Sequence, residues 1–288
     1  MRNVAILITV LIVLPLYVRC TVHYVDGEKG DDSNDGKSVT SPFATIKTCI
    51  DTLANPGDEC HIRGGRYHQS EFNISGKLGS PSQPIIIRGY EEEVPIIDGT
   101  ILLKPIENSA WKRTKDGMYT AKIEQDIWQL FVDGEMMTNA RWPNALWSDR
   151  TVFLNKHWAK SAKSSTRGKM VDSGEKNLAG SGLNATGAIA ILNIGSFNTF
   201  TAIVKDHAPG QNFFTYSDTF GDIKFKASHN QYFLEDKLEF LDQAGEWFYD
   251  KNTKTVYVMT LDGKSPEGRI RGKVEEYALW SCLKFLPS

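Results

Sequence analysis

One stretch near the N-terminus, residues 23–68, constrains the fold more than any other part of the sequence. It begins with a short β-prone run, His23–Val25, and continues into a polar loop rich in Asp, Asn, Ser and Gly. A helical pattern follows, and a turn at residues 55–58 then leads into a second β-prone run, Cys60–Arg63. The stretch therefore predicts the order strand, acidic loop, helix, sharp turn and strand.

The helix is predicted from apolar side chains whose spacing places them on one face: Phe43, Ile46, Ile50 and Leu53. Ser41 is expected as its N-cap and Pro42 as its first residue, because proline lacks the N–H group that this position leaves unpaired. We expect the apolar face to pack across the strands around Ile62 and Ile86.

Residues 23–38, 41–53 and 56–68 together closely resemble the opening of secreted right-handed parallel β-helix proteins of the pectin-lyase-like superfamily. The resemblance implies a mainly β fold in which the helix caps the first coil, because an open end would expose apolar core and unpaired strand edges. It implies no single function, since the superfamily includes lyases, hydrolases and non-enzymes. Residues 85–90 echo residues 60–65 after twenty-five positions, a separation that suits one coil.

The middle of the chain predicts antiparallel strands. Asp133–Gly134 between β-prone runs indicates a hairpin, because a type I′ turn needs positive φ at both central residues. A second hairpin is expected around Lys251–Lys254. Residues 129–135 and 140–144, and then 230–250 and 254–258, resemble segments of some β-helix glycoside hydrolase-like proteins, in which an antiparallel insertion precedes the main solenoid. We therefore expect the cap and first coils at 21–99, a large antiparallel insertion at 100–262, and the return strands of an apparently truncated β-helix at 263–288.

Residues 1–20 have the character of a secretory signal peptide, with Arg2, an apolar run from Val4 to Leu16, and a cleavage site near Cys20. The alternative is a retained N-terminal anchor. Cleavage would remove two of 33 basic residues and none of 35 acids, leaving a net charge of about −4. This balance argues against a nucleic-acid partner. No later segment is apolar enough to span a membrane, so we expect a secreted, extracellular protein.

Three cysteines would remain after cleavage. An oxidising compartment favours a disulfide between Cys49 on the helix and Cys60 in the strand that the helix covers. Cys282 is then unpaired: it bonds another chain, is buried, or has lost its partner with a missing C-terminal part. Asn73 and Asn184 each begin the acceptor pattern for N-glycosylation.

Two further groups of residues are candidates for ligand binding. Asp31, Asp32 and Asp35 are spaced like the first oxygen ligands of a calcium loop, although Pro42 stands where a bidentate Glu is needed. A solvated turn is the alternative to bound Ca²⁺, and no motif requires a cofactor. Arg141 and Trp142 form a candidate carbohydrate contact, with a packed structural corner as the alternative.

No catalytic residue is assigned from the sequence. A glycoside hydrolase needs two facing carboxylates, but we expect the candidate acids to lie on solvated hairpin edges: Glu235, Asp236, Glu239, Asp242 and Glu246. His157 and Trp158 indicate a site only if folding gathers partners around them.

Two functional hypotheses remain. In the enzymes that the chain resembles, catalytic groups lie on later coils, and this chain ends at Ser288, about where those coils would begin. The first hypothesis is a secreted, non-catalytic matrix or surface protein that contacts glycans, matrix proteins or mineral. The alternative is a polysaccharide-active enzyme, either a glycoside hydrolase or a lyase, or the N-terminal fragment of one.

Overall fold

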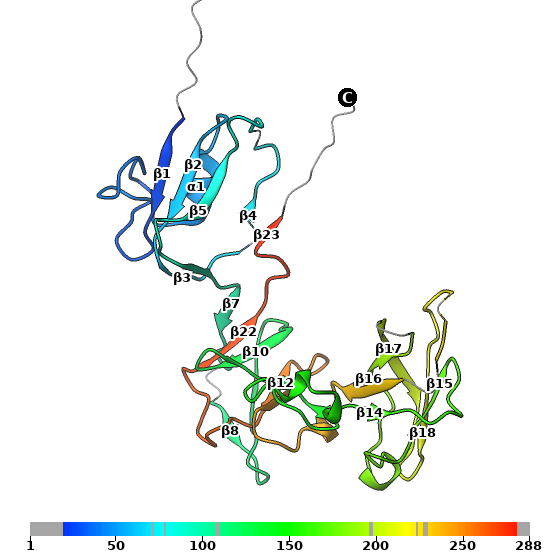
Figure 1. Ribbon diagram of the computed structural model, residues 1–288. Coiled ribbons are helices and arrows are strands. Elements are labelled where there is room, and N and C mark those ends of the chain that lie inside the picture. The colour runs from blue at the N-terminus through cyan, green and yellow to red at the C-terminus, as the bar shows by residue number, and fades with distance from the viewer. Residues whose placement is uncertain are drawn as a thin grey trace, which may run out of the picture. The chain divides into compact units, whose positions relative to one another are not determined.

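The computed structural model describes residues 20–70, 72–77, 79–106, 110–195, 198–222, 224–226 and 230–280 (Figure 1). The expected signal peptide, apart from Cys20, and Cys282 lie outside the described residues. The fold is mainly β and divides into two compact units. Unit 1 comprises residues 1–99 and 275–288, and unit 2 comprises residues 100–274. Unit 2 thus ends at Val274, whereas the insertion expected from the sequence ends at residue 262.

The described strands of unit 1 pair in parallel. Its largest sheet has the order β1-β2-β5, from β1 (Val22–Val25), β2 (Glu59–Ile62) and β5 (Ile86–Gly89). Two parallel pairs accompany it: β3 (Gly65–Tyr67) with β6 (Pro95–Ile97), and β4 (Phe72–Asn73) with β23 (Leu279–Trp280). Parallel pairing requires each strand to return by a crossover connection, so this unit is built from residues far apart in the sequence.

The register between β2 and β5 differs slightly from the expected repeat. Cys60 lies beside Ile87, two positions beyond Ile85, the residue that the sequence echo places there. Side chains alternate between the faces of a strand, so a shift by two positions keeps the same residues facing inward. The repeat therefore keeps the same side chains facing inward, although the strands pair two positions away from the register that the repeat predicts.

Helix α1 (Ile46–Thr52) begins later than the sequence predicts. Its N-cap is Thr45, whose side-chain oxygen accepts a hydrogen bond from the Thr48 N–H group. The predicted start at Ser41 and Pro42 is wrong, because the chain is extended there: the Phe43 N–H group donates to the carbonyl of Tyr24.

The apolar face predicted for the helix is nevertheless buried as a whole. Phe43, Ile46, Ile50 and Leu53 belong to one hydrophobic cluster with Val25 and Ile62. Phe43 joins this cluster from an extended segment that bridges to Val25. The spacing therefore predicted burial correctly, although only part of the spaced segment is helical.

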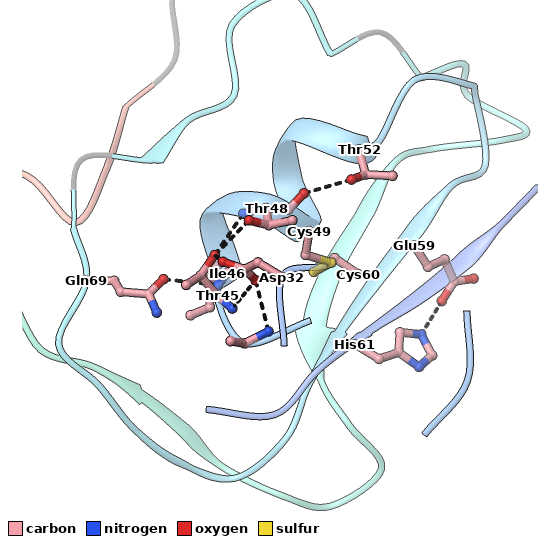
Figure 2. The surroundings of a disulfide bond; sticks show 11 residues. Asp32, Thr45, Ile46, Thr48, Cys49, Thr52, Glu59, Cys60, His61 and Gln69 are labelled. Atoms are coloured by element: carbon pink, nitrogen blue, oxygen red, sulfur yellow. Dashed lines mark hydrogen bonds and ion pairs between the residues drawn. A yellow bond between two sulfur atoms is a disulfide. The ribbon is translucent and has the colours of Figure 1, made fainter. Parts of the chain in front are cut away.

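The predicted disulfide between Cys49 and Cys60 is present (Figure 2). Both residues are fully buried, and their Cα atoms are 6.1 Å apart. The bond joins α1 to β2 and ties the helix to the parallel sheet.

Unit 2 is built mostly from antiparallel strands in three sheets. The first has the order β11-β10-β22-β7, from β7 (Thr100–Leu102), β10 (Gln129–Val132), β11 (Glu135–Met136) and β22 (Ile270–Lys273). The second has the order β12-β20-β21-β9-β8, from β8 (Lys112–Arg113), β9 (Tyr119–Lys122), β12 (Thr138–Asn139), β20 (Glu246–Asp250) and β21 (Thr255–Val258). Within these sheets, the pair β12–β20 is the parallel exception.

The third sheet of unit 2 positions the candidate site. Its order is β13-β19-β16-β17-β18-β15, with β14 beside β19, from β13 (Arg141–Trp142), β14 (Ala159–Lys160), β15 (Lys169–Val171), β16 (Ile189–Asn193), β17 (Thr199–Asp206), β18 (Phe213–Tyr216) and β19 (Gln231–Glu235). Short 3₁₀ helices join the strands: η1 (Thr151–Phe153), η2 (Asn155–His157), η3 (Ala179–Ser181) and η5 (Leu238–Phe240).

Both predicted hairpins are confirmed. Strands β10 and β11 pair antiparallel across Asp133 and Gly134, whose φ angles of 52° and 83° are the positive values that the turn needs. Strands β20 and β21 pair antiparallel across residues 251–254. Among the described helices, none is long and apolar enough to cross a membrane.

Candidate functional site

A pocket with a volume of about 230 Å³ opens in unit 2, where β13 and β19 meet the segment that carries η1 and η2. Four of its lining residues are aromatic: Trp147, Phe153, Trp158 and Phe233. Three others bring polar groups that can recognise a ligand: Asn139, Arg141 and Glu235. A concave site with apolar walls and a few convergent polar groups is typical of small-molecule binding.

Strand pairing brings Arg141 and Glu235 together. The two residues lie directly opposite each other in the antiparallel pair β13–β19, so their side chains leave the sheet on the same face. Phe233 lies two residues before Glu235 on β19 and shares this face. The next pair, Trp142 opposite Leu234, faces the other way. Because side chains alternate between the two faces of β13 and β19, those on one face line the pocket and those on the other face pack into the core.

Arg141 is a buried cation, with only 3% of its surface exposed. Its Nε donates to the carbonyl of Pro143 at 3.0 Å, and Nη2 donates to the carbonyl of His157 at 3.2 Å. The guanidinium carbon lies 3.8 Å from the ring centroid of Phe233. Burial lowers the pKa of Arg141 to about 10, even though the nearby Glu235 carboxyl acts in the opposite direction.

The Glu235 carboxyl is held in an environment that favours its neutral form. Burial raises its pKa to about 7, and Asp236 adds to the rise, while the charge of Arg141 opposes it. The described residues provide no hydrogen-bond partner for this carboxyl. Near neutral pH it can therefore either donate or accept a hydrogen bond from a ligand.

Asn139 adds a further polar group to the wall. Its side-chain nitrogen donates to Asp236 at 3.4 Å, whereas its buried Oδ1 has no hydrogen-bond partner among the described residues. A buried acceptor without a partner is costly unless a ligand or water satisfies it. Asn139 is thus suited to accept from a ligand hydroxyl.

The aromatic residues form two perpendicular pairs. The rings of Trp158 and Phe233 have centroids 4.7 Å apart, and those of Trp147 and Phe153 are 5.3 Å apart. Trp147 and Phe153 remain 39% and 68% exposed, so apolar ring surface is presented to solvent at this site. The backbone N–H group of Trp147 donates to the Thr138 hydroxyl at 3.0 Å, which ties the Trp147–Phe153 pair to β12.

The predicted carbohydrate contact is divided between two environments. Arg141 lines the pocket, whereas Trp142 packs against the hydrophobic core, with its ring 6.2 Å from that of Tyr232. The sequence made Trp158 a candidate only if folding gathered partners around it, and it does lie in the pocket beside Phe233. Phe233 was missed, and Glu235 was considered only as a solvated acid, because nothing local in their segment shows that β19 lies beside β13.

The expectation that the acids of residues 235–246 are solvated holds for Glu239 and Asp242, but Glu235 and Asp236 are partly buried and Glu246 is buried. Glu246 is fully buried, and Glu235 is partly buried in the pocket wall. Burial raises the pKa of Glu246 to about 8, and the charge of Asp242 adds to the effect. Glu246 does not line the pocket, so the pocket presents one carboxyl from this group.

The acidic loop uses its carboxylates within the protein. Asp31 accepts from the Ser33 N–H group, Asp32 from the Thr45 N–H group, and Asp35 from the Lys37 N–H group. In the described part of the chain, no group of three or more acid, His or Cys side chains is placed to hold a metal ion. The structure therefore does not gather these three residues into the expected cation site.

The candidate glycosylation sites both lie at the surface. Asn73 and Asn184 are exposed, and each side-chain oxygen accepts a hydrogen bond from the backbone N–H group two residues later, at Ser75 and Thr186. Their exposure leaves both amides accessible.

No family model matches this chain. A stretch of 76 residues is 33% identical to pectate lyase PEL9 of Emericella nidulans. This stretch makes up 26% of this chain and 18% of the lyase. A solved structure described as a glycoside hydrolase matches with a TM-score of 0.64 and 17% sequence identity, over 91% of this chain and 48% of that one. The chain thus spans about half of that hydrolase and shares its fold over this length.

Proposed function

We propose that this protein acts on or binds extracellular polysaccharides, and that the pocket of unit 2 holds one of their sugar residues. The observation that carries the proposal is the combination of aromatic rings with Asn139, Arg141 and Glu235 in one pocket. Sugar rings offer apolar faces that pack on aromatic rings and hydroxyl groups that hydrogen-bond to planar polar side chains.

The comparisons favour the second sequence hypothesis. The matched proteins are named as a pectate lyase and a glycoside hydrolase, and their names concern carbohydrate chemistry. No observation favours a non-catalytic matrix role. A polysaccharide-active protein is therefore the better proposal, and its catalytic activity is tested below together with binding.

The parallel pairing in unit 1 supports the more specific proposal of a β-helix. We propose that β1-β2-β5, β3-β6 and β4-β23 are the first stacked strands of three faces, with α1 as the cap. In this arrangement the first coil takes 37 residues, from His23 to its strand neighbour Cys60, and the second takes 27 residues, from Cys60 to its neighbour Ile87. An experimental structure in which these three faces do not wind into one right-handed coil would contradict this proposal.

The functional test measures binding and cleavage on the same material. Purified protein is incubated with a panel of pectin, alginate, xylan, chondroitin and fucan, and bound protein is measured by sedimentation with the insoluble polymer or by affinity electrophoresis. New reducing ends report hydrolysis, and the ultraviolet absorbance of an unsaturated uronate reports a lyase. Binding to at least one polymer is expected. Failure to bind or cleave any member of the panel counts against the proposal.

A matched pair of variants locates the site. Trp147→Ala removes an exposed ring that lines the pocket, and Trp128→Ala removes a ring that is 50% exposed but lies outside the pocket lining. Packing an aromatic ring contributes about 1.5–3 kcal/mol, so Trp147→Ala should weaken binding about tenfold or more. Trp128→Ala should leave binding unchanged, and an equal loss in both variants would place the site elsewhere.

Secretion and glycosylation form part of the same proposal. Both acceptor asparagines are exposed, as attachment of a glycan requires. Expression in a secreting eukaryotic cell should yield protein in the medium whose mass falls on treatment with an endoglycosidase. Asn73→Gln and Asn184→Gln should each remove one glycan. An intact mass equal to the bare polypeptide would exclude both sites.

A further inference from the structure

The buried charge of Arg141 leads to an inference about the kind of sugar that the pocket binds, and this inference rests on the proposed function. Other arginines of the protein pair with acids: Arg63 with Glu93, Arg167 with Asp218, and Arg269 with Asp133. Those side chains are partly exposed. Arg141 is far more buried, and although the Glu235 and Glu246 carboxyls act on its pKa from a distance, no described residue forms an ion pair with its guanidinium.

The two carbonyl groups that Arg141 contacts do not replace an anion. They position the guanidinium, but each carries only a partial charge, so the cation is held out of water without a full counter-charge. Buried charges are usually paired, because an uncompensated ion loses its hydration free energy. An anionic group that enters the pocket would supply the missing partner.

Glu235 does not supply this partner below neutral pH. Its pKa of about 7 means that most of the carboxyl groups are then protonated and uncharged. In that form the group is a hydrogen-bond donor, and it shares the pocket with Arg141. The two side chains together present N–H and O–H donors, which suits the oxygens of an acid group.

The guanidinium retains donors for such a ligand. A guanidinium has five N–H donors in a planar fork, and the protein uses one on Nε and one on Nη2. Carboxylate and sulfate oxygens match this fork. Phe233 lies against the face of the guanidinium and leaves its edge for hydrogen bonding.

The volume of the pocket limits how much ligand it can hold. Its 230 Å³ lies below the range of about 300–1,000 Å³ that is usual for drug-sized ligands. A single sugar residue is therefore a better fit than an oligosaccharide. The exposed Trp147 and Phe153 rings are then available for the part of the ligand that remains outside.

We propose that this pocket binds one acidic sugar residue, whose carboxylate or sulfate group pairs with the Arg141 guanidinium. Asn139 accepts a hydrogen bond from a hydroxyl of the same residue, and the aromatic rings pack on its apolar face. The pocket thus selects charged over neutral sugars, at a position on the antiparallel unit and not on the parallel strands.

Three small probes test this selection on the full protein: methyl glucuronide, methyl glucoside and methyl glucoside 6-sulfate. Binding is followed at about pH 6 by calorimetry and by the fluorescence of the pocket tryptophans, since Glu235 is mostly neutral there. We expect at least one acidic probe to bind about tenfold or more tightly than the neutral glucoside, the gain typical of a charge-assisted hydrogen bond. The comparison of glucuronide with sulfate shows which acid group the pocket prefers.

Variants assign the effect to one side chain. Arg141→Gln should abolish the preference for acidic probes, and Arg141→Lys should retain part of it, because a point charge remains without the planar fork. Thermal unfolding shows whether each variant is folded. If Arg141→Gln does not fold, the test rests on the preference of the wild-type protein for acidic probes and on its partial reduction in Arg141→Lys; an undiminished preference in Arg141→Lys would contradict the inference.

The outcomes separate this inference from the proposed function. Equal affinity for neutral and acidic probes, or an acidic preference that persists in a folded Arg141→Gln variant, overturns the inference and leaves polysaccharide binding intact. Polymer binding without any affinity for the acidic probes also overturns it. If neither polymers nor probes bind, both the inference and the proposed function are wrong.

Discussion

Asp32 and Thr45 form a paired cap at the start of α1 (Figure 2). Oδ1 of Asp32 accepts from the Thr45 N–H group at 2.9 Å, and Oδ2 accepts from the Thr45 hydroxyl at 2.8 Å. The Thr45 hydroxyl in turn accepts from the Thr48 N–H group at 3.1 Å. The acidic loop thus positions the helix cap with the carboxylate that the sequence suggested for calcium.

This relationship predicts a structural effect of Asp32. Asp32→Ala should lower the free energy of unfolding by about 1 kcal/mol, the usual loss when a helix-capping hydrogen bond is removed. Asp35→Ala is the control, because among the described residues the Asp35 carboxylate accepts a hydrogen bond from Lys37 N–H alone, within its own turn. Urea unfolding with Ca²⁺ and with EDTA measures both variants. A wild-type protein that is markedly more stable in Ca²⁺ would instead support the metal hypothesis.

The disulfide predicts a larger effect on stability. Replacing Cys49 and Cys60 together by alanine should cost about 3 kcal/mol, mainly because the unfolded chain regains the freedom of a short closed loop. Reduction of the wild-type protein should give the same shift in urea unfolding, and the double variant should not respond to the reductant. A reductant-sensitive double variant would show that another bond contributes.

The raised pKa of the buried Glu246 carboxyl predicts that the protein loses stability as pH rises. Its folded pKa of about 8 lies above the ordinary value of 4.5, so between these values the folded state holds a proton that the unfolded state has released. The free energy of unfolding should therefore fall through this window, by at most about 1.4 kcal/mol per pH unit. Glu235 acts in the same direction only up to about pH 7.

The interval between about pH 7 and pH 8 therefore isolates Glu246 from Glu235 and from Arg141, whose pKa is about 10. Glu246→Gln preserves the shape of the side chain and should flatten the pH dependence there, whereas Glu267→Gln, at an exposed position, should retain the wild-type slope. Urea unfolding at a series of pH values makes the comparison. An unchanged slope in Glu246→Gln would show that this carboxyl is not the group responsible.

Trp142 and Trp147 should behave differently when each is replaced by alanine. Trp142 packs against the core beside Tyr232, so its loss should lower the free energy of unfolding by about 3–5 kcal/mol at most. Trp147 lies at the pocket, and its loss should weaken polysaccharide binding with little change in stability. If the folded fraction of Trp142→Ala also bound polysaccharide more weakly than the wild-type protein, the carbohydrate contact predicted from the sequence for this residue would be supported.

Local patterns in the sequence predicted several elements correctly. The hairpin at Asp133–Gly134 follows from the positive φ that this dipeptide tolerates, and the cysteine pair follows from helix and strand lying close together. Apolar spacing identified the buried face around Ile50. The start of α1 was misplaced because Ser41 and Pro42 satisfy the local rules for a cap, while the deciding contacts come from Asp32 and Val25.

The pocket could not be predicted from such local patterns. Arg141 could be singled out from its own neighbourhood, but its significance depends on Phe233 and Glu235, which lie on β19 more than ninety positions later. The sequence by itself determined which short segments become strands, turns and the capping helix, because those choices depend on neighbouring residues. Only the tertiary structure decided which strands pair, and with them which charges are buried, because strand pairing depends on contacts between residues far apart in the chain.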